Sequence, residues 1–264
     1  MMDGKVIAVT RAEESQGETA GMIRSRGGIP LYFPTVRFRK ARSETAVSLL
    51  MDESGSGKID IIVFMSWNAF VYLSKIALGL GFKDVRRNLG KASIVAIGSQ
   101  TAQKLASAGL SVDAVAQRYS SDGIAELLGK SGIVGKRIAL VRNKSAKSDL
   151  KSRLALLGAE VTEIPTYCTR VPREPERARL FIKKMSCGGV DALTFGSPLA
   201  AENMFKILEG QIGAQKTREM LSKAVIAAIG PTTAKRLEGL GLRADVVPET
   251  YTFKDMLDGL ERRL

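Results

Sequence analysis

Short apolar runs recur along the chain, and longer stretches with apolar residues at helical spacing separate them. Clear examples of the apolar runs are residues 6–9, 61–64, 94–97, 138–141 and 226–229. Strands that are apolar on both faces are typical of a parallel sheet covered by helices on both sides. The pattern therefore predicts an α/β protein with parallel sheets.

The pattern also occurs twice. Equivalent residues stand 131 positions apart through most of the chain and 132 apart after one insertion, as in Arg11 and Arg142, Pro34 and Pro165, Ser66 and Ser197, and Gly98 and Gly230. A shift this constant indicates duplication of one unit. Each copy predicts the order strand, helix, strand, strand, helix, strand, helix, strand, helix, which favours two flavodoxin-like sheets of five strands each. Gly109 and Gly241 are expected just beyond helix ends, in the left-handed conformation that glycine tolerates.

Composition narrows the chemistry. The 264 residues contain no histidine and only two cysteines, Cys168 and Cys187, which we expect to be reduced thiols. Histidine-based acid–base or nucleophilic catalysis is excluded, and so is the commonest metal ligand. We expect a cytoplasmic protein, because the sequence has no leader-like segment and no apolar run of about 20 residues, the length a membrane span needs.

The net charge of +13 favours an anionic partner. Basic residues are scattered along the chain, as at 37–40, 83–91 and 216–223, and do not form one block. Scattered charge argues against a nucleic-acid partner and favours a small polyanion or ordinary surface charge.

The segments that follow the predicted strands are rich in serine, threonine and glycine. Ligands of open parallel sheets bind at the carboxyl ends of the strands, so these segments are the candidate site. Each segment alone is explained as a helix cap, but several helix amino termini together form a receiver for carboxylates or phosphates. No segment carries a Walker or GxGxxG pattern, so we expect neither a nucleotide cofactor nor a metal.

These motifs resemble those of the uroporphyrinogen-III synthase family. The most specific is the run Ala-Ile-Gly-Pro-Thr-Thr-Ala at residues 228–234. Weaker matches, spread over nearly the whole chain, are Val-Thr-Arg at 9–11, Phe-Pro-Thr-Val at 33–36, Phe-Met-Ser-Trp-Asn-Ala at 64–69, Ala-Ile-Gly at 96–98, Pro-Thr-Tyr at 165–167 and Phe-Gly-Ser-Pro at 195–198.

The resemblance implies two flavodoxin-like domains that are joined by a two-stranded β-ladder and have a cleft between them. It implies a discontinuous first domain, residues 1–36 with 169–264, a second domain of residues 37–168, and linker strands near 33–38 and 163–170. The residues alone also allow two sequential halves, because exchanging equivalent segments between copies keeps every type of contact.

The activity implied is that of a cyclising hydro-lyase. It would close hydroxymethylbilane to uroporphyrinogen III, inverting ring D and releasing water, without cofactor or metal. Such chemistry depends on positioning a flexible substrate and on hydrogen-bond donors. The implied partner is this small molecule, with a transient hand-over from hydroxymethylbilane synthase, and we expect a monomer.

The resemblance and the strand-end positions together give the candidate residues. Tyr167 is expected to assist departure of the hydroxyl, with Thr101 and Thr233 as further donors. Residues expected to bind substrate are Arg11, Ser66, Trp67, Asn68, Gly98, Ser99, Arg142, Gly196, Ser197, Gly230 and Thr232. An alternative from another class is a non-catalytic two-lobed receptor or regulator that binds an anionic metabolite.

Overall fold

The computed structural model describes residues 1–146 and 149–264. The chain divides into two compact units. Unit 1 combines Met1–Arg37 with Arg170–Leu264, and unit 2 is Phe38–Thr169. Each unit has its own sheet, so the two are described separately.

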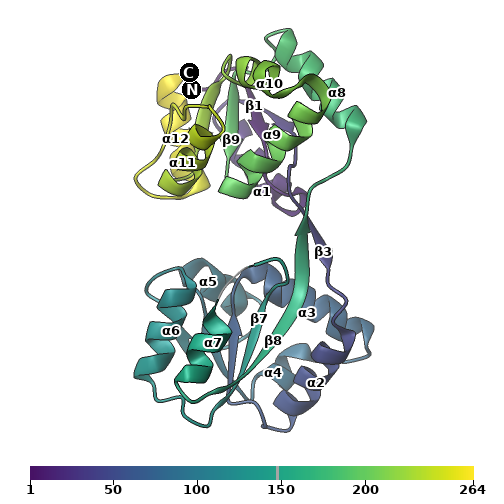
Figure 1. The fold of residues 1–264 in the computed structure, drawn as a ribbon, viewed down its shortest axis with the longest axis vertical. Coiled ribbons are helices and arrows are strands. Elements are labelled where there is room, and N and C mark those ends of the chain that lie inside the picture. Colours follow the sequence, from purple (N-terminus) through teal and green to yellow (C-terminus); the bar gives the residue numbers. More distant parts are fainter. Residues whose placement is uncertain (147–148) are drawn as a thin grey trace. The chain divides into compact units, whose positions relative to one another are not determined.

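Unit 1 is built from both ends of the chain (Figure 1). Its amino-terminal part contains β1 (Val6–Val9), a 3-10 turn (Glu13–Ser15), α1 (Gln16–Arg24) and β2 (Ile29–Tyr32). Its carboxy-terminal part contains α8 (Pro175–Ser186), β9 (Ala192–Phe195), α9 (Pro198–Ile212), α10 (Ala214–Leu221), β10 (Val225–Ala228), α11 (Pro231–Gly239) and α12 (Phe253–Arg263).

The sheet of unit 1 has the order β10-β9-β1-β2, and all pairs are parallel. The central strand β1 therefore pairs with β9, which lies far along the chain; Ala8 stands opposite Leu193. Residues of α8 to α11 pack on one face, and residues of α1 and α12 pack on the other. This is the arrangement that continuous apolar strands require.

Unit 2 contains the middle of the chain. Its elements are β3 (Arg37–Lys40), α2 (Glu44–Gly55), β4 (Ile61–Phe64), α3 (Trp67–Gly79), α4 (Val85–Leu89), β5 (Ser93–Ala96), α5 (Ser99–Ser107), β6 (Ala114–Val115), α6 (Ser121–Lys130), β7 (Arg137–Asn143), α7 (Leu150–Leu156) and β8 (Glu160–Arg170). The sheet order is β3-β8-β7-β4-β5-β6, and the pairs from β8 to β6 are parallel. Strands β3 and β8, the segments where the chain passes between units, are neighbours in this sheet.

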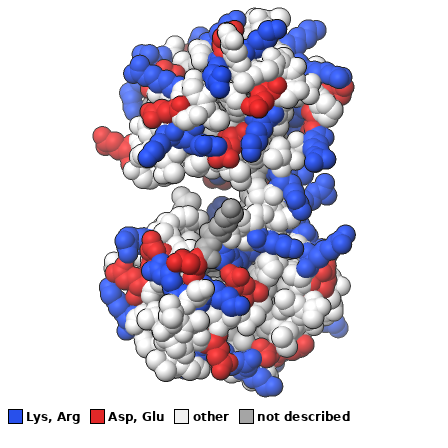
Figure 2. All heavy atoms as spheres, in the orientation of Figure 1, with Lys and Arg blue, Asp and Glu red and all other residues white. Residues whose placement is uncertain are grey.

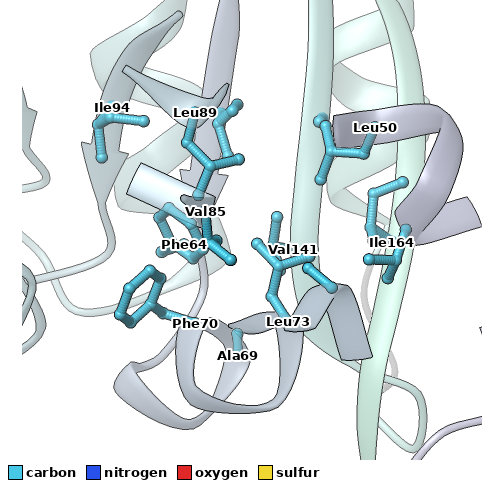
Figure 3. Packing of buried hydrophobic residues seen from close by; sticks show 14 of the residues in the cluster. Leu50, Phe64, Ala69, Phe70, Leu73, Val85, Leu89, Ile94, Val141 and Ile164 are labelled. Carbon is cyan, nitrogen blue, oxygen red and sulfur yellow. The ribbon is translucent and has the colours of Figure 1, made fainter. Parts of the chain in front are cut away.

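Figure 3 shows part of the larger core cluster of unit 2. Phe64, Val141 and Ile164 come from three neighbouring strands, and Leu73 of α3 packs among them. All four side chains are at most 2% exposed. Burial of apolar surface stabilises a fold by about 25 cal/mol per Å², so contacts such as these are the main contribution to the packing of α3 on the sheet.

The two copies occupy equivalent places after an exchange of segments. In unit 2, β7 lies next to β4 and is followed by β8. In unit 1, β1 lies next to β9 in the same way and is followed by β2. Equivalent anchors secure both: Asp60 accepts a 2.8 Å hydrogen bond from the backbone N–H of Arg137, and Asp191 accepts one of 2.8 Å from that of Val6. The predicted fold class, parallel α/β units in duplicate, is confirmed.

The prediction of five strands in each sheet was wrong in detail. Unit 1 has four strands and a single parallel bridge between Ala227 and Val246, whereas β6 pairs fully in the equivalent place of unit 2. Pro248 follows in unit 1, and proline lacks the N–H that would continue a strand ladder. The predicted left-handed glycines are confirmed, with φ of 83° at Gly109 and 77° at Gly241.

Candidate functional site

In each unit two strands lead within two residues into a helix amino terminus: β4 into α3 and β5 into α5 in unit 2, and β9 into α9 and β10 into α11 in unit 1. Ser66 caps α3 by accepting a 3.1 Å hydrogen bond from the Ala69 N–H, and Ser197 caps α9 by accepting one of 3.1 Å from Ala200. Gly98 and Gly230 hold the N-cap positions of α5 and α11 without a side-chain cap. The free N–H groups of such termini, with the helix dipole, favour an anion at this edge of each sheet.

Tyr167 is the centre of the site in unit 2. Its hydroxyl lies 2.9 Å from Ser66 Oγ, and only 6% of the residue is exposed. Tyr72 stacks on the ring with 5.5 Å between ring centroids, and Phe38 packs against it nearly perpendicularly, also at 5.5 Å. Three elements thus fix one phenol, because β8 supplies Tyr167, α3 supplies Tyr72 and β3 supplies Phe38.

Burial raises the pKa of Tyr167 above its ordinary value of 10, with Tyr119 adding to the rise, while hydrogen bonds to Ser66 and Asn143 oppose it. The phenol is therefore neutral near neutral pH and keeps a proton to donate. A neutral, fixed phenol can donate to a leaving oxygen or to a developing negative charge.

The other predicted residues of unit 2 lie close to this edge of the sheet. Trp67 is partly buried and contacts Phe70 at 5.4 Å between ring centroids, and Asn68 is half-buried. Ser99 is exposed, whereas Thr101 is only 4% exposed, in the first turn of α5.

Arg142 is already occupied in the structure. It is 5% exposed, its Nη1 lies 2.6 Å from Glu163 Oε1, and its Nη2 donates a 2.7 Å hydrogen bond to the Ala146 carbonyl. Sequence reasoning could not foresee this pair, because it depends on the register of β7 against β8. Removing Glu163 would leave this guanidinium buried without its charge partner, so Arg142 is committed to a contact within unit 2.

Arg11, the equivalent residue of unit 1, is in the opposite situation. Its side chain is half-buried, with the guanidinium carbon 5.3 Å from the ring centroid of Phe253. Burial lowers the pKa of Arg11 below its ordinary value, and the negative charge of Glu18 partly offsets this. Among residues 1–146 and 149–264, no carboxylate forms an ion pair with it within 4.0 Å.

Near Arg11, Gly196 is half-buried, and a Cβ atom on it would stand 3.4 Å from Arg11 Cγ. Gly230 is buried, Thr232 is exposed and Thr233 is 2% exposed. The structure thus joins Ser66 to Tyr167 in unit 2 and Arg11 to Gly196 in unit 1. Thr101 and Thr233 belong to different units.

Two exposed tyrosines were missing from the predicted set. Tyr119 packs on Gly98 and Tyr251 packs on Gly230, so closely that an added Cβ would lie 2.6 Å and 3.1 Å from the respective rings. They are 68% and 61% exposed. The signal available in the sequence was their spacing of 132, the same shift that separates the two glycines.

In the described part of the chain, no group of three or more histidine, cysteine or acidic residues could hold a metal ion. Within the same residues, no helix is both long and apolar enough to cross a membrane. The fold and the strand-end residues define the class of the protein as a duplicated, two-unit α/β protein that presents hydroxyls, amides and the guanidinium of Arg11 at the carboxyl edges of its sheets.

Comparison with known proteins specifies the family. The family model described as Uroporphyrinogen-III synthase HemD matches residues 17–258. A putative uroporphyrinogen-III synthase of Methanothermobacter thermautotrophicus is 34% identical over 260 residues, which covers 96% of each chain. A uroporphyrinogen-III synthase of Chlorobaculum parvum is 24% identical over 247 residues, covering 94% of each.

Solved structures agree in fold. A mutant uroporphyrinogen III synthase of Thermus thermophilus superposes with a TM-score of 0.64 at 24% identity, over 98% of both chains. The synthetase of Helicobacter pylori gives a TM-score of 0.60 at 15% identity, over 99% of this chain and 100% of the other. The chain belongs to the uroporphyrinogen-III synthase family. The prediction of a lyase of tetrapyrrole biosynthesis is thereby confirmed.

Proposed function

We propose that the protein closes hydroxymethylbilane to uroporphyrinogen III, with inversion of ring D and loss of water. The observation that carries this proposal is the contact between Ser66 and Tyr167, which holds a neutral phenol beside the helix termini of unit 2. A cyclisation of this kind needs a donor to the departing hydroxyl and a fixed substrate, and it needs no nucleophile from the protein.

Tyr167 acts in this proposal as the donor to the leaving oxygen. Ser66 Oγ accepts the N–H of Ala69 and lies within hydrogen-bond distance of the Tyr167 hydroxyl. In this proposal the serine donates its proton to Tyr167, which leaves the phenolic proton for the substrate. As the carbon–oxygen bond breaks, the oxygen leaves as water, and the substituted carbon of ring D attacks the cationic carbon to give a spiro intermediate. The bond between this ring D carbon and the methylene bridge to ring C then breaks, and the cationic methylene carbon that it leaves is attacked by the unsubstituted α-carbon of ring D, which inverts the ring. When that α-carbon loses its proton, the proton that the phenol gave to the departing water is replaced, so no further reagent is required.

The carboxylates of the substrate are proposed to bind at the strand ends of both units. Arg11 supplies a charged donor, Ser197 and Thr232 supply hydroxyls, and amides after Gly98, Gly196 and Gly230 supply neutral donors. Ser66, Trp67, Asn68 and Ser99 complete the proposed contacts, and Thr101 and Thr233 remain proposed donors. Arg142 we now propose as a structural residue, because Glu163 neutralises it.

The product isomer tests the proposal. Freshly made hydroxymethylbilane is incubated with the protein, and uroporphyrins I and III are separated after oxidation. Type III as the main product supports the synthase activity; type I alone, formed at the spontaneous rate, contradicts it. The alternative of a non-catalytic receptor is not favoured, since the matching family model and the relatives named above are synthases.

The surroundings of the reaction are proposed from the same family membership. Hydroxymethylbilane synthase would hand its product over transiently, and the protein would act as a monomer in the cytoplasm. Nucleic acid is not a proposed partner: on the face in Figure 2, Lys and Arg side chains are interspersed with Asp and Glu and form no continuous stripe.

A further inference from the structure

The two copies present equivalent arginines in unlike states. Arg11 follows β1 and Arg142 lies near the end of β7, 131 residues later. The Arg142 guanidinium forms a 2.6 Å ion pair with Glu163, whereas Arg11 forms no ion pair with any of the described residues. Duplication alone would have made the two alike, so the difference arose after it.

Strand register explains the difference. In unit 2, β7 pairs with β8 so that Leu140 stands opposite Glu163. In unit 1, the same register sets Val9 opposite Tyr32. Tyr32 therefore occupies the place of Glu163, and its hydroxyl is bonded to the Gln16 carbonyl at 3.0 Å. A phenol in unit 1 thus stands where unit 2 has the carboxylate that closes its arginine.

Phe253 takes part in holding the open arginine. It is the first residue of α12, is 6% exposed, and lies under the Arg11 guanidinium at 5.3 Å. At the equivalent position, 132 residues earlier, unit 2 has Ser121, which has no ring. A cation over an aromatic face is attracted by the ring, yet the planar edge of the guanidinium keeps its donors free for a bidentate acceptor.

The half-buried Arg11 guanidinium has lost part of its hydration. Contact with an aromatic ring replaces less of the lost electrostatic stabilisation than an ion pair with a carboxylate would. An anionic ligand would supply what is missing. We propose that Phe253 is a positioning residue that holds Arg11 as an open receptor for one carboxylate, and that Arg142 does not serve unit 2 in this way because Glu163 occupies it. That this carboxylate is an acetate or propionate arm of the tetrapyrrole rests on the proposed function.

The first test introduces into unit 1 an arginine–glutamate ion pair equivalent to the Arg142–Glu163 pair of unit 2. In Tyr32→Glu, the new carboxylate stands in the register of Glu163 and should capture Arg11, while Tyr32→Gln has the same shape without charge. We expect KM to rise about 10- to 100-fold in Tyr32→Glu, the range for one lost charged hydrogen-bonded contact, with kcat changed much less. Tyr32→Gln should stay within about threefold of the wild type. Equal effects of the two substitutions on KM would overturn the inference.

The second test addresses Phe253. Phe253→Leu keeps an apolar side chain but removes the ring, and Phe253→Tyr keeps both. A positioning role predicts a KM raised several-fold in Phe253→Leu, an unchanged kcat, and recovery in Phe253→Tyr. A purely structural role predicts instead that thermal stability falls while KM stays the same, and this result contradicts the inference.

A binding measurement separates this inference from the proposed function. Mellitate, an unreactive benzene hexacarboxylate, is titrated calorimetrically into the wild type and both Tyr32 variants. Weaker binding in Tyr32→Glu alone supports the receptor even if the wild type yields only type I product. Type III product combined with unchanged KM and mellitate affinity in Tyr32→Glu would sustain the proposed function and reject the receptor.

Discussion

The carboxylate of Asp191 accepts a 2.8 Å hydrogen bond from the backbone N–H of Val6, a residue 185 positions away, and forms a 3.0 Å ion pair with the Lys5 ammonium. This contact fastens the start of β1 to the loop before β9. Asp60 does the same for β7 in unit 2, with Arg137 and Lys136. One aspartate in each unit thus fixes the entry of its central strand.

Replacing this anchor should weaken unit 1. Asp191→Asn keeps an acceptor but loses the charge, and we expect the free energy of unfolding to fall by about 1–2 kcal/mol, the scale of a charge-assisted hydrogen bond. Chemical denaturation measures the change. Asp52→Asn, an exposed position on α2, is the matched control and should be nearly neutral. Equal stabilities of the two variants would contradict the assignment of Asp191 as an anchor.

The same anchor predicts a pH dependence. Burial opposes ionisation of Asp191, but the Val6 N–H and the Lys5 ammonium outweigh it and lower its pKa. A group whose folded pKa is lowered contributes stability above its unfolded pKa, and the contribution is lost as pH falls through the folded value. The stability difference between wild type and Asp191→Asn should therefore be full at neutral pH and shrink below about pH 4. Chemical denaturation of both proteins at decreasing pH, as far as they remain folded, measures this difference in the free energy of unfolding. A difference that increases at acid pH contradicts the prediction.

Removing the phenol should reduce turnover. Tyr167→Phe keeps the ring between Tyr72 and Phe38 and deletes the hydroxyl that contacts Ser66. Loss of a positioned proton donor predicts a kcat about 10²- to 10⁴-fold lower with a similar KM. Initial rates of type III formation measure this, and the thermal midpoint verifies folding. Tyr32→Phe, which deletes a hydroxyl in unit 1, is the control; full activity of Tyr167→Phe would remove the tyrosine from the mechanism.

A methyl group on the N-cap glycines should disturb the exposed tyrosines. The Cβ of Gly98→Ala would meet Tyr119 at 2.6 Å, and that of Gly230→Ala would meet Tyr251 at 3.1 Å, so the first ring must move further. We expect KM to rise in both variants, more in Gly98→Ala, because the methyl narrows the space beside amides proposed to bind carboxylates. Thermal stability should change little, since both rings are largely exposed and free to shift. A larger KM in Gly230→Ala would reverse this ranking.

Much of the fold was predictable because its cause is local. Apolar runs such as Ile61–Phe64 are buried on both faces only as strands of a parallel sheet that is covered by helices. Because equivalent residues of the two copies stand a constant distance apart, a strand predicted in one copy also predicted its equivalent in the other. The pairing of β1 with β9 was not predictable in the same way. Equivalent strands carry equivalent surfaces, so either partner would bury the same kinds of side chain.

The site was less predictable, because its contacts join distant strands. Arg11 and Arg142 occupy equivalent positions in the two copies of the sequence. They differ in the residue on the adjacent strand, which is Tyr32 beside β1 and Glu163 beside β7, and only Glu163 can form an ion pair with the arginine. The partner of Tyr167 likewise lies 101 residues away, at Ser66. Such relationships follow from register and packing, which a list of motifs does not contain.

The discontinuous make-up of unit 1 sets an order of events during synthesis. The ribosome delivers β1 first, but its neighbour β9 is made more than 180 residues later, after all of unit 2. Unit 2 can therefore complete its sheet while Ile7, Ala8 and Val9, all fully buried in the finished protein, still lack one neighbouring strand. While unit 2 folds, the nascent chain thus contains an apolar strand that can pair on one side only, with β2, and the need for chaperones should be greatest in that interval.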